Sequence, residues 1–357
     1  MADPMIGMVS WSCPSNIALV KYWGKKGFQL PSNPSLSMTL DKSVTHMDFR
    51  FEYDPERTEM SFQFSFEGTT NEKFGSKIRD YLVRIAPSMP FLYHLEIDIQ
   101  SHNTFPHSAG IASSASAMGA LALCLCSVEE QVSGVVKSKQ AFFRQASNLA
   151  RLASGSASRS VYGGFVAWGE SEMIKDSSDE YAVQIPFEIN PEFNTMHDAI
   201  LIVSSREKGV SSRAGHKLMD NHYYGEGRMV QVRDHLQELI EAMKTGDFER
   251  FVTVVENEAL SLHGLMLASN PSFLLMAPNT IEIISRIRAF RERTRIPICF
   301  TLDAGPNVHL LYRDADHIEV KQFIIEELAQ FCEAGRWIAD GIGKGPVKRD
   351  GIQNGLF

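Results

Sequence analysis

Small hydroxyl and glycine residues gather in residues 102–123, HNTFPHSAGIASSASAMGALAL, between a strand-like stretch and an uncharged helix-like one. Small side chains let backbone N–H groups approach a ligand closely, and a helix N-terminus offers unpaired donors and a positive dipole end. The serine hydroxyls could bind a phosphate or a metal ion. A serine-capped, tightly packed helix is the alternative interpretation. The residues concerned are Ser108, Gly110, Ser113, Ser114 and Ser116.

Two lysines flank aromatic residues in NIALVKYWGK at 16–25. Lys21 and Lys25 stand on either side of Tyr22 and Trp23. Ammonium groups beside aromatic rings, directly after a strand-like run, suit an anionic ligand. An ordinary solvated pair of lysines is the alternative, and this segment alone favours it.

Two further segments combine cations with hydroxyls. In residues 153–165, ASGSASRSVYGGF, alternate serines lead to Arg159, whose planar guanidinium suits a carboxylate or a phosphate. In residues 206–219, REKGVSSRAGHKLM, Lys208 and Arg213 stand among hydroxyls ahead of a helix. Each pattern is typical of an anion site, and a surface arginine or a capped helix start is the alternative. The serines are Ser154, Ser156, Ser211 and Ser212.

One carboxylate follows an apolar strand directly. Asp303 comes after CFTL and enters the tight turn AGPN. A carboxylate at such a position could act as a general base or orient a hydroxyl group. An Asx-turn residue without chemistry is the alternative.

The composition limits the class of protein. Among 357 residues, 35 Lys and Arg face 43 Asp and Glu, a net charge of −8, whereas nucleic-acid-binding domains usually carry a basic surplus. We therefore expect no nucleic-acid partner, and an anionic ligand needs a local cationic pocket. The sequence contains no G-x-x-x-x-G-K-[ST], no G-x-G-x-x-G after a strand and no H-E-x-x-H, which argues against the usual nucleotide and zinc-peptidase signatures.

Cysteine usage and hydropathy indicate the compartment. The five cysteines are scattered and form no Cys-x-x-Cys pair, which argues against a disulfide framework or a zinc site. No secretory signal is visible, and no apolar stretch approaches the roughly 18 residues that span a bilayer. The sequence predicts a cytoplasmic, reduced protein with no membrane partner.

Local patterns predict the elements that must position these residues. Residues 44–66 alternate polar and apolar positions around DPER and predict an antiparallel hairpin. Residues 113–128 predict a helix that is buried nearly all round, because no charge interrupts them. Further helices are expected at 72–85 and 139–154, and strands at 92–101 and 162–170.

The composition changes near residue 192, where polar and proline-containing segments precede the next strand. We place a domain boundary there, with domains at 1–192 and 193–357. Helices and strands intermingle without regular βαβ spacing, so the predicted class is α+β. The Gly-rich tail from residue 343 is expected to pack loosely. The second half should hold helices at 229–244, 247–268, 280–293 and 316–333, and strands at 297–303 and 307–312.

Together the segments resemble the GHMP kinase superfamily and, within it, the diphosphomevalonate decarboxylase family. The turn after Asp303 is the most specific feature, because superfamily kinases usually carry a Gly-rich loop there. The blocks that carry the resemblance are NIALVKYWGK (16–25), LPSNPSLSMTL (30–40), FPHSAGIASSASA (105–117), SGSASRSVYGGFVAW (154–168), KGVSSRAG (208–215) and FTLDAGPN (300–307).

The resemblance implies a two-domain α+β GHMP kinase-like fold, with a ribosomal protein S5 domain 2-like N-terminal domain and a ferredoxin-like C-terminal domain. It implies a homodimer whose active site lies in the interdomain cleft. The implied reaction is ATP-dependent, Mg²⁺-assisted decarboxylation of (R)-mevalonate 5-diphosphate to isopentenyl diphosphate, through phosphorylation of the 3-hydroxyl group, in isoprenoid biosynthesis.

The resemblance also implies roles for individual residues. Asp303 matches the catalytic aspartate beside the 3-hydroxyl, Lys21 a lysine near the same group, and Arg159 the arginine that holds the substrate carboxylate. Ser114 takes the key serine position of the phosphate loop and is the candidate Mg²⁺ ligand. Substrate-binding positions are Tyr22, Lys25, Lys73, Ser154, Ser156 and Ser211. ATP-binding positions are Ser108, Gly110, Ser113, Ser114, Ser116, Lys208 and Ser212.

Departures from the family pattern leave two alternatives open. Lys73 stands where relatives often place an arginine for the diphosphate, and His107 replaces a small residue. A relative acting on mevalonate 5-phosphate or acting only as a 3-kinase is one alternative, and a non-catalytic ligand sensor is the other. We assign none of the eleven histidines to the site. We expect Lys21, Lys25, Lys73, Arg159, Lys208 and Arg213 to converge on the cleft.

Overall fold

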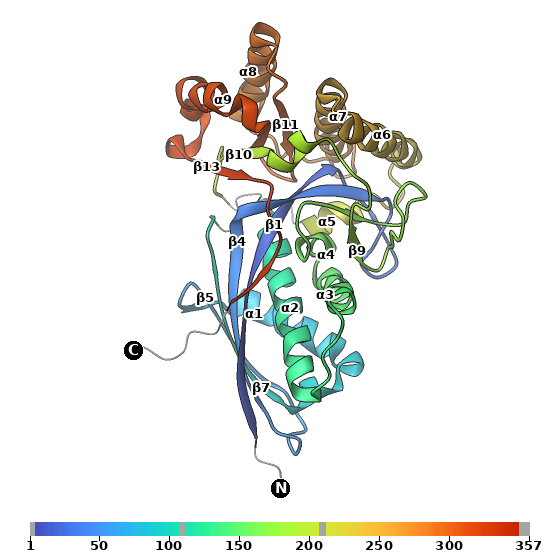
Figure 1. Ribbon diagram of the computed structural model, residues 1–357, viewed down its shortest axis with the longest axis vertical. Helices are drawn as coiled ribbons and strands as arrows, with labels where there is room; N and C mark the ends of the chain where they lie inside the picture. Colours follow the sequence, from blue (N-terminus) through green and yellow to red (C-terminus); the bar gives the residue numbers. More distant parts are fainter. Residues whose placement is uncertain (1–3, 107–110, 207–211, 350–357) are drawn as a thin grey trace.

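The computed structural model describes residues 4–106, 111–206 and 212–349, although the side chains of 212–214 are not described. Eight of the described strands form one sheet in the order β14-β1-β4-β7-β5-β6, with β8 paired to β4 and β9 to β8 (Figure 1). The bounds are β1 Met5–Val20, β4 Ser35–Tyr53, β5 Ser61–Phe66, β6 Thr69–Thr70, β7 Leu95–Asn103, β8 Phe165–Trp168, β9 Ala182–Gln184 and β14 Val347–Arg349. A short hairpin pairs β2 (Lys25–Lys26) with β3 (Leu30–Pro31).

Strands β1 and β4 form the long antiparallel centre of this sheet. Their pairing runs from Met5 opposite Tyr53 to Val20 opposite Leu36. Register shifts interrupt the ladder between Pro14 and Asn16 and between Ala18 and Val20. Such irregularities bend a strand and re-aim its side chains. They lie just before Lys21, so they help to set where its side chain points.

Helices cover this sheet, as Figure 1 shows. The helix α2 is buried along most of its length, as its uncharged sequence predicts, and it ends at Gly134 in the left-handed conformation. Gly119 allows its close approach to β1, because a Cβ there would lie 2.6 Å from Cys13 Sγ. The bounds are α1 Glu72–Ile85, α2 Ser113–Ser133, α3 Lys139–Ala153 and α4 Ala157–Ser160.

A second sheet, in the order β11-β12-β10-β13, lies at the other end of the molecule (Figure 1). Its strands are β10 His197–Leu201, β11 Cys299–Leu302, β12 Val308–Tyr312 and β13 Trp337–Gly341. The second half of the chain also contains the helices α5 Ser212–Lys217, α6 Gly225–Thr245, α7 Phe248–Leu267, α8 Pro278–Thr294 and α9 His317–Phe323. None of the described helices is both long and apolar enough to cross a membrane.

A hydrophobic core joins the two halves. Leu19 and Leu36, at the ends of β1 and β4, pack in one cluster with Leu236 of α6 and Val255 of α7. All four side chains are fully buried. The far end of the first sheet therefore rests against helices of the second half.

Three expectations about the elements are wrong. Residues 44–66 form no hairpin, because β7 pairs with β4 and lies between it and β5, which runs parallel to β7. The α-helix expected over 316–333 ends at Phe323 and continues as a π-helix over Ile324–Leu328. The tail expected to pack loosely contains β14, which pairs with β1, so the expectation is wrong for residues 343–349, while residues 350–357 lie outside the described structure. Sequence periodicity identifies a strand but does not name its partner.

Candidate active site

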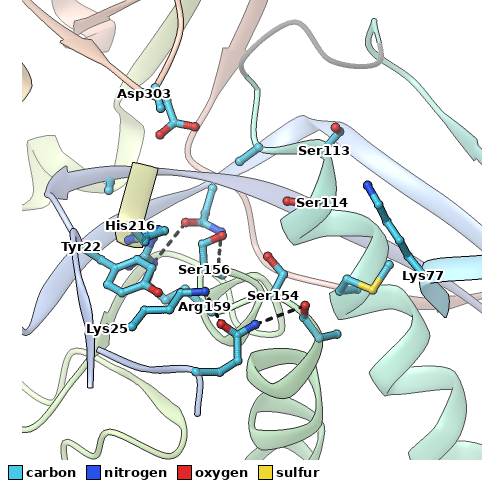
Figure 2. A pocket seen from close by; sticks show the side chains of 18 of the residues that line it. Tyr22, Lys25, Lys77, Ser113, Ser114, Ser154, Ser156, Arg159, His216 and Asp303 are labelled. Atoms are coloured by element: carbon cyan, nitrogen blue, oxygen red, sulfur yellow. Dashed lines mark hydrogen bonds between the residues drawn. The ribbon is translucent and has the colours of Figure 1, made fainter. Parts of the chain in front are cut away.

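A cavity of about 640 Å³ lies between the two halves of the chain. Most of its wall comes from the first half, while His216, Leu262, Asp303 and Ala304 come from the second. Figure 2 shows His216 and Asp303 among the residues of the wall. The wall brings together many of the residues predicted from the sequence. These are Lys21, Tyr22, Lys25, Lys73, Ser113, Ser114, Ser154, Ser156, Arg159 and Asp303.

Lys21 follows β1 directly and is only 2% exposed. Its Nζ donates to the carbonyl of Ala18 at 2.5 Å and to Thr301 Oγ1 at 2.7 Å. Burial lowers the pKa of Lys21 to about 8, although the carboxylate of Asp303 opposes this fall. The result is a fixed cation whose proton is held less tightly than that of a surface lysine.

Arg159 lies in the short helix α4 and is also buried. Its Nε donates to Asn16 Oδ1 at 3.2 Å, and one Nη donates to Ser35 Oγ. Burial lowers the pKa of Arg159 to about 10, again opposed by Asp303. The guanidinium therefore stays charged at neutral pH and is held in one orientation, as recognition of a planar anion requires.

Asp303 lies in the connection between β11 and β12. Its backbone carbonyl accepts from Gly305 N–H at 2.7 Å and contacts His263 Nε2 at 3.2 Å. Its charge acts on the pKa values of Lys21 and Arg159, so the three groups share one electrostatic environment. The structure thus brings together the three side chains predicted to be catalytic.

The serine-rich segment begins α2 at the wall of the cavity. Ser113 and Ser114 line it, and Ala112 precedes them with a φ of 45°. The N-terminal N–H groups of a helix are donors for an anion. Ser116 does not line the cavity: its hydroxyl is buried 2.6 Å from Thr45 Oγ1. Its predicted contact with ATP therefore has no geometric support.

Several predicted positions fall outside the described structure. These are Ser108, Gly110, Lys208 and Ser211, together with the side chains of Ser212 and Arg213. The expected convergence of cations is therefore met for Lys21, Lys25, Lys73 and Arg159. The backbone of Ser212 begins α5, the helix that carries His216.

The helix α1 adds cations that the sequence analysis missed. Lys77 and Arg84 line the cavity together with Lys73, and Asp80 stands among them. Residues four and eleven positions apart lie on the same face of an α-helix. This spacing was visible in the sequence, but nothing there shows that α1 turns that face toward the cavity.

His216, which the sequence left without an assigned role, also lines the cavity. Its Nδ1 accepts from Gly24 N–H at 3.0 Å, and its ring lies 4.2 Å from that of Tyr22 and 4.5 Å from that of Trp23. Burial lowers the pKa of His216 to about 3, and Lys25 adds to the effect. A neutral imidazole thus ties α5 to the segment that carries both lysines.

Lys25 and Tyr22 are the other polar groups of that segment. Lys25 Nζ donates to Gln29 Oε1, and Gln29 Nε2 donates to the carbonyl of Ala153 at 3.4 Å. Among the described residues, the buried hydroxyl of Tyr22 has no hydrogen-bond partner. A buried polar group of this kind in a cavity wall is available to a ligand.

Whether the cavity wall can hold Mg²⁺ depends on the oxygen ligands that it offers. Within the described part of the chain, no group of three or more His, Cys, Asp or Glu side chains is placed to hold a metal ion. Mg²⁺ usually keeps several waters and binds through substrate phosphates with one or two protein oxygens. The Ser114 hydroxyl, in the wall beside the N-terminus of α2, suits such a partial site.

Comparison with known proteins finds relatives for both halves of the chain. Residues 13–181 match the diphosphomevalonate decarboxylase-like N-terminal domain, and residues 199–342 match the mevalonate 5-diphosphate decarboxylase C-terminal domain. The diphosphomevalonate decarboxylase of Ganoderma lucidum is 33% identical over 89% of this chain and 82% of its own length. The chain belongs to the diphosphomevalonate decarboxylase family. The enzyme of that name from Saccharomyces cerevisiae is 30% identical over 88% of this chain and 80% of its own length.

Solved structures agree with this family and with its fold. The structure of MDDEF in complex with MVAPP, AMPPCP and magnesium matches with a TM-score of 0.81 and 31% identity, covering 97% of this chain and all of that one. Mevalonate diphosphate decarboxylase from Staphylococcus aureus matches with a TM-score of 0.81 and 29% identity, covering 97% of this chain and 99% of that one. The family resemblance and the two-domain α+β fold predicted from the sequence are confirmed.

Proposed function

We propose that this protein catalyses the ATP-dependent decarboxylation of (R)-mevalonate 5-diphosphate to isopentenyl diphosphate, with release of ADP, phosphate and CO2. The observation that carries the proposal is the meeting of Asp303, Lys21 and Arg159 in one cavity wall of a chain from this family. A related protein has been solved with MVAPP, an ATP analogue and magnesium in complex.

Phosphoryl transfer to the 3-hydroxyl group comes first. Such a transfer depends mainly on positioning and on stabilising the charge that develops on the phosphoryl group. Asp303 orients the tertiary hydroxyl and accepts its proton, while Lys21 adds positive charge beside it. Ser113, Ser114 and the N-terminus of α2 bind the phosphates of ATP. Ser114 would hold Mg²⁺ together with the phosphates, and the ion would neutralise part of the phosphate charge.

Decarboxylation then follows from the same bound substrate. The C–C bond to the carboxylate breaks, and its electron pair forms the carbon–carbon double bond as the 3-phosphate leaves with the C–O electron pair. Arg159 holds the carboxylate on the side opposite the leaving phosphate, which is an orientation effect. Its fixed, buried guanidinium supports this role.

The 5-diphosphate needs its own cationic subsite. Lys25, Lys73 and the Tyr22 hydroxyl are proposed to bind it, together with Ser154 and Ser156. Lys77 and Arg84 extend the cationic wall beyond the sequence prediction. For the segment outside the described residues we retain the proposed contacts of Ser211 with substrate and of Ser108, Gly110 and Lys208 with ATP, and we retain Ser212 with ATP.

We propose a cytoplasmic homodimer with domains at 1–192 and 193–357. All five cysteines are free and buried, which supports a reducing compartment. Apart from β14, the strands of the first sheet end at Gln184 and those of the second begin at His197, which supports a boundary between them. Sedimentation equilibrium of the purified protein tests the dimer, and a monomer at micromolar concentration contradicts it.

A coupled assay tests the proposed reaction. The protein, ATP and Mg²⁺ are offered mevalonate, its 5-phosphate or its 5-diphosphate, and ADP and CO2 are measured separately. Equal release of ADP and CO2 from the 5-diphosphate alone is the expected result. Turnover of the 5-phosphate instead identifies a phosphomevalonate decarboxylase, and ADP without CO2 identifies a 3-kinase. No turnover with any of the three substrates contradicts both enzyme functions.

The variant Asp303→Asn tests the carboxylate in the same assay. We expect turnover to fall by about 1,000-fold or more, because the amide cannot accept the hydroxyl proton. Binding of an ATP analogue, measured by calorimetry, should change little. Turnover at the wild-type rate would remove Asp303 from the mechanism.

A further inference from the structure

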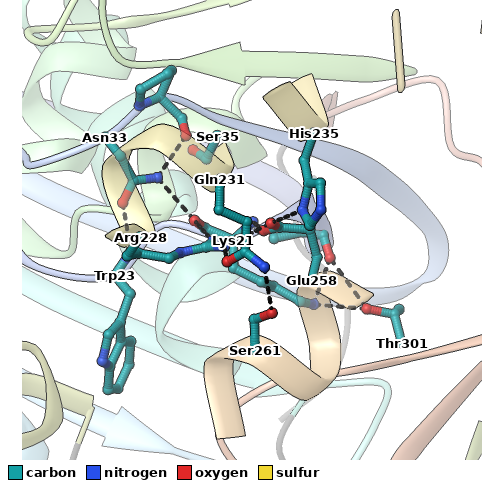
Figure 3. A network of polar contacts seen from close by, with 12 residues as sticks. Lys21, Trp23, Asn33, Ser35, Arg228, Gln231, His235, Glu258, Ser261 and Thr301 are labelled. Carbon is teal, nitrogen blue, oxygen red and sulfur yellow. Dashed lines mark hydrogen bonds and ion pairs between the residues drawn. The ribbon is translucent and has the colours of Figure 1, made fainter. Parts of the chain in front are cut away.

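The backbone of Lys21 is held by side chains from the other half of the chain. Its N–H donates to Glu258 Oε2 at 2.7 Å, and its carbonyl accepts from Arg228 Nη2 at 3.1 Å (Figure 3). Arg228 lies on α6 and Glu258 on α7. One pair of side chains therefore binds both polar backbone groups of a single residue.

The two side chains form a buried, bidentate ion pair. Both Nη atoms of Arg228 donate to the carboxylate of Glu258, each at 2.6 Å, and the side chains are 1% and 0% exposed. His235 Nδ1 lies 2.6 Å from Glu258 Oε1. Burial opposes the ionisation of Glu258, but the hydrogen bonds from Arg228 and His235 lower its pKa to about 2. The carboxylate is therefore charged at neutral pH.

A buried ion pair of this kind contributes little net stability to a fold. Removing two charges from water opposes their mutual attraction, so apolar residues of the same volume often stabilise a protein as well or better. A bidentate pair does, however, fix geometry. Here that fixed geometry is applied to the residue whose ammonium group also donates to Thr301, two positions before Asp303.

We propose that Arg228 and Glu258 are positioning residues that hold the Lys21 ammonium group in place beside Asp303. This inference rests on the proposed role of Lys21 in phosphoryl transfer. The two residues touch no substrate and act only through Lys21. A displacement of about 1 Å in a reacting group can lower the rate about 100-fold. Loss of the hydrogen bonds that hold the Lys21 backbone should therefore lower kcat.

The pair also has an electrostatic effect on Lys21. Burial, Arg159 and Arg228 lower the pKa of Lys21, whereas Asp303 and Glu258 raise it. Loss of the Glu258 charge should therefore lower the pKa of Lys21 further. The alkaline limb of kcat, where Lys21 loses its proton, then moves to lower pH.

The variant Glu258→Gln tests the inference against a matched control, Glu256→Gln. Glu256 lies two residues away on α7, is also buried, and pairs with Arg288 and Arg291 on the side away from Lys21. We expect Glu258→Gln to lower kcat about 10- to 100-fold, to leave KM for ATP within about twofold, and to shift the alkaline limb to lower pH. Glu256→Gln should lower the thermal midpoint but leave kcat and its pH profile unchanged.

Two results would overturn the inference. One is a wild-type kcat and alkaline limb in folded Glu258→Gln, and the other is an equal loss of kcat in Glu256→Gln. The milder variant Arg228→Lys covers the case in which Glu258→Gln does not fold. It keeps the charge but loses the bidentate contact, so kcat should fall at least 5-fold with little shift of the limb, and an unchanged kcat would contradict the inference.

A measurement without turnover separates this inference from the proposed function. NMR of protein labelled at lysine Cε, with the Lys21 signal assigned by Lys21→Met, follows the titration of Lys21 directly. Its pKa should be lower in Glu258→Gln than in wild type and unchanged in Glu256→Gln. This holds even if the wild-type protein decarboxylates nothing, which would count against the proposed function alone. Equal Lys21 pKa values in wild type and Glu258→Gln would overturn the electrostatic link.

Discussion

Arg159 combines a fixed orientation with a positive charge in a buried position. Its guanidinium is oriented by Asn16 and Ser35 and remains charged despite burial. In Arg159→Lys the charge persists, but the planar fork that suits a carboxylate is lost. We expect kcat/KM for mevalonate 5-diphosphate to fall about 100-fold.

The matched control for this prediction is Arg233→Lys, because Arg233 is well exposed and does not line the cavity. Steady-state kinetics with both ADP and CO2 detection measures the effect. A kcat/KM within threefold of wild type in Arg159→Lys would show that charge alone is enough at this position.

His216 links the site to stability at low pH. The pKa of this side chain is lowered to about 3 in the folded protein, compared with about 6.5 in an unfolded chain. Between these values the unfolded state binds one more proton, so stability is lost as the pH falls from about 6.5 toward 3. In His216→Met this loss should disappear, and the slope of unfolding free energy against pH should fall by up to about 1.4 kcal/mol per pH unit.

Urea unfolding of wild type and His216→Met at several pH values measures these slopes. Comparison of differences between pH values removes the constant effect of exchanging the ring for a thioether. Parallel curves between pH 6.5 and 4 would mean that His216 takes up its proton equally in both states.

At the scale of elements, Gly119 shows why α2 can lie so close to β1. A Cβ at Gly119 would meet Cys13 Sγ at 2.6 Å, whereas at Gly264 in α7 no heavy atom lies within 4 Å. We expect Gly119→Ala to lower the free energy of unfolding by about 1–3 kcal/mol through overpacking. Gly264→Ala should instead raise it by up to about 1 kcal/mol. Chemical denaturation measures both, and equal effects would contradict the packing argument.

The sequence predicts a helix correctly where the spacing of nearby apolar residues determines it. The period of three and four in residues 72–85 defines α1, whose observed bounds are the predicted ones. The prediction of a hairpin over 44–66 is wrong because strand pairing joins distant residues. Beside β4 in the sheet lie β1 and β7, and the residues of β7 that pair with β4 are 42 to 58 positions further along the chain. No local pattern encodes that choice.

The residues of the candidate site likewise comprise some that the sequence predicts and others that it does not. Asp303 and Arg159 were found because distinctive segments surround them. Lys77 and Arg84 were missed because their role arises only when α1 docks beside the cavity. The positioning pair Arg228 and Glu258 could not be found from sequence, since each lies in an ordinary amphipathic helix more than 200 residues from Lys21.

At the scale of the whole molecule, Asp340 fastens one half of the chain to the other. Its carboxylate, at the end of β13, accepts from the backbone N–H groups of Asp41, Lys42 and Ser43 at 2.8–2.9 Å. Hydrogen bonds to a charged group each contribute about 1.5–3 kcal/mol. We expect Asp340→Asn to lower the free energy of unfolding by about 3 kcal/mol.

Thermal and urea unfolding measure this loss, with Asp234→Asn as the control because Asp234 is largely exposed. The control should stay within about 0.5 kcal/mol of wild type. A similarly small change in Asp340→Asn would show that these contacts do not hold the halves together.

The net charge of −8 also makes sense at this scale. The cations of the cavity wall meet in one place, so an acidic molecule can still attract phosphates there. The acidic surplus on the remaining surface favours solubility.

The pairing of β14 with β1 closes part of a sheet edge with a segment that lies more than 300 residues further along the chain. Residues 347–349 cover Ser10, Trp11 and Ser12, so this stretch of edge has no strand beside it until that distant segment has been synthesised. An uncovered strand edge is a template for pairing with other chains. The nascent protein must therefore be protected from its neighbours at this edge for as long as the residues between the two strands take to emerge.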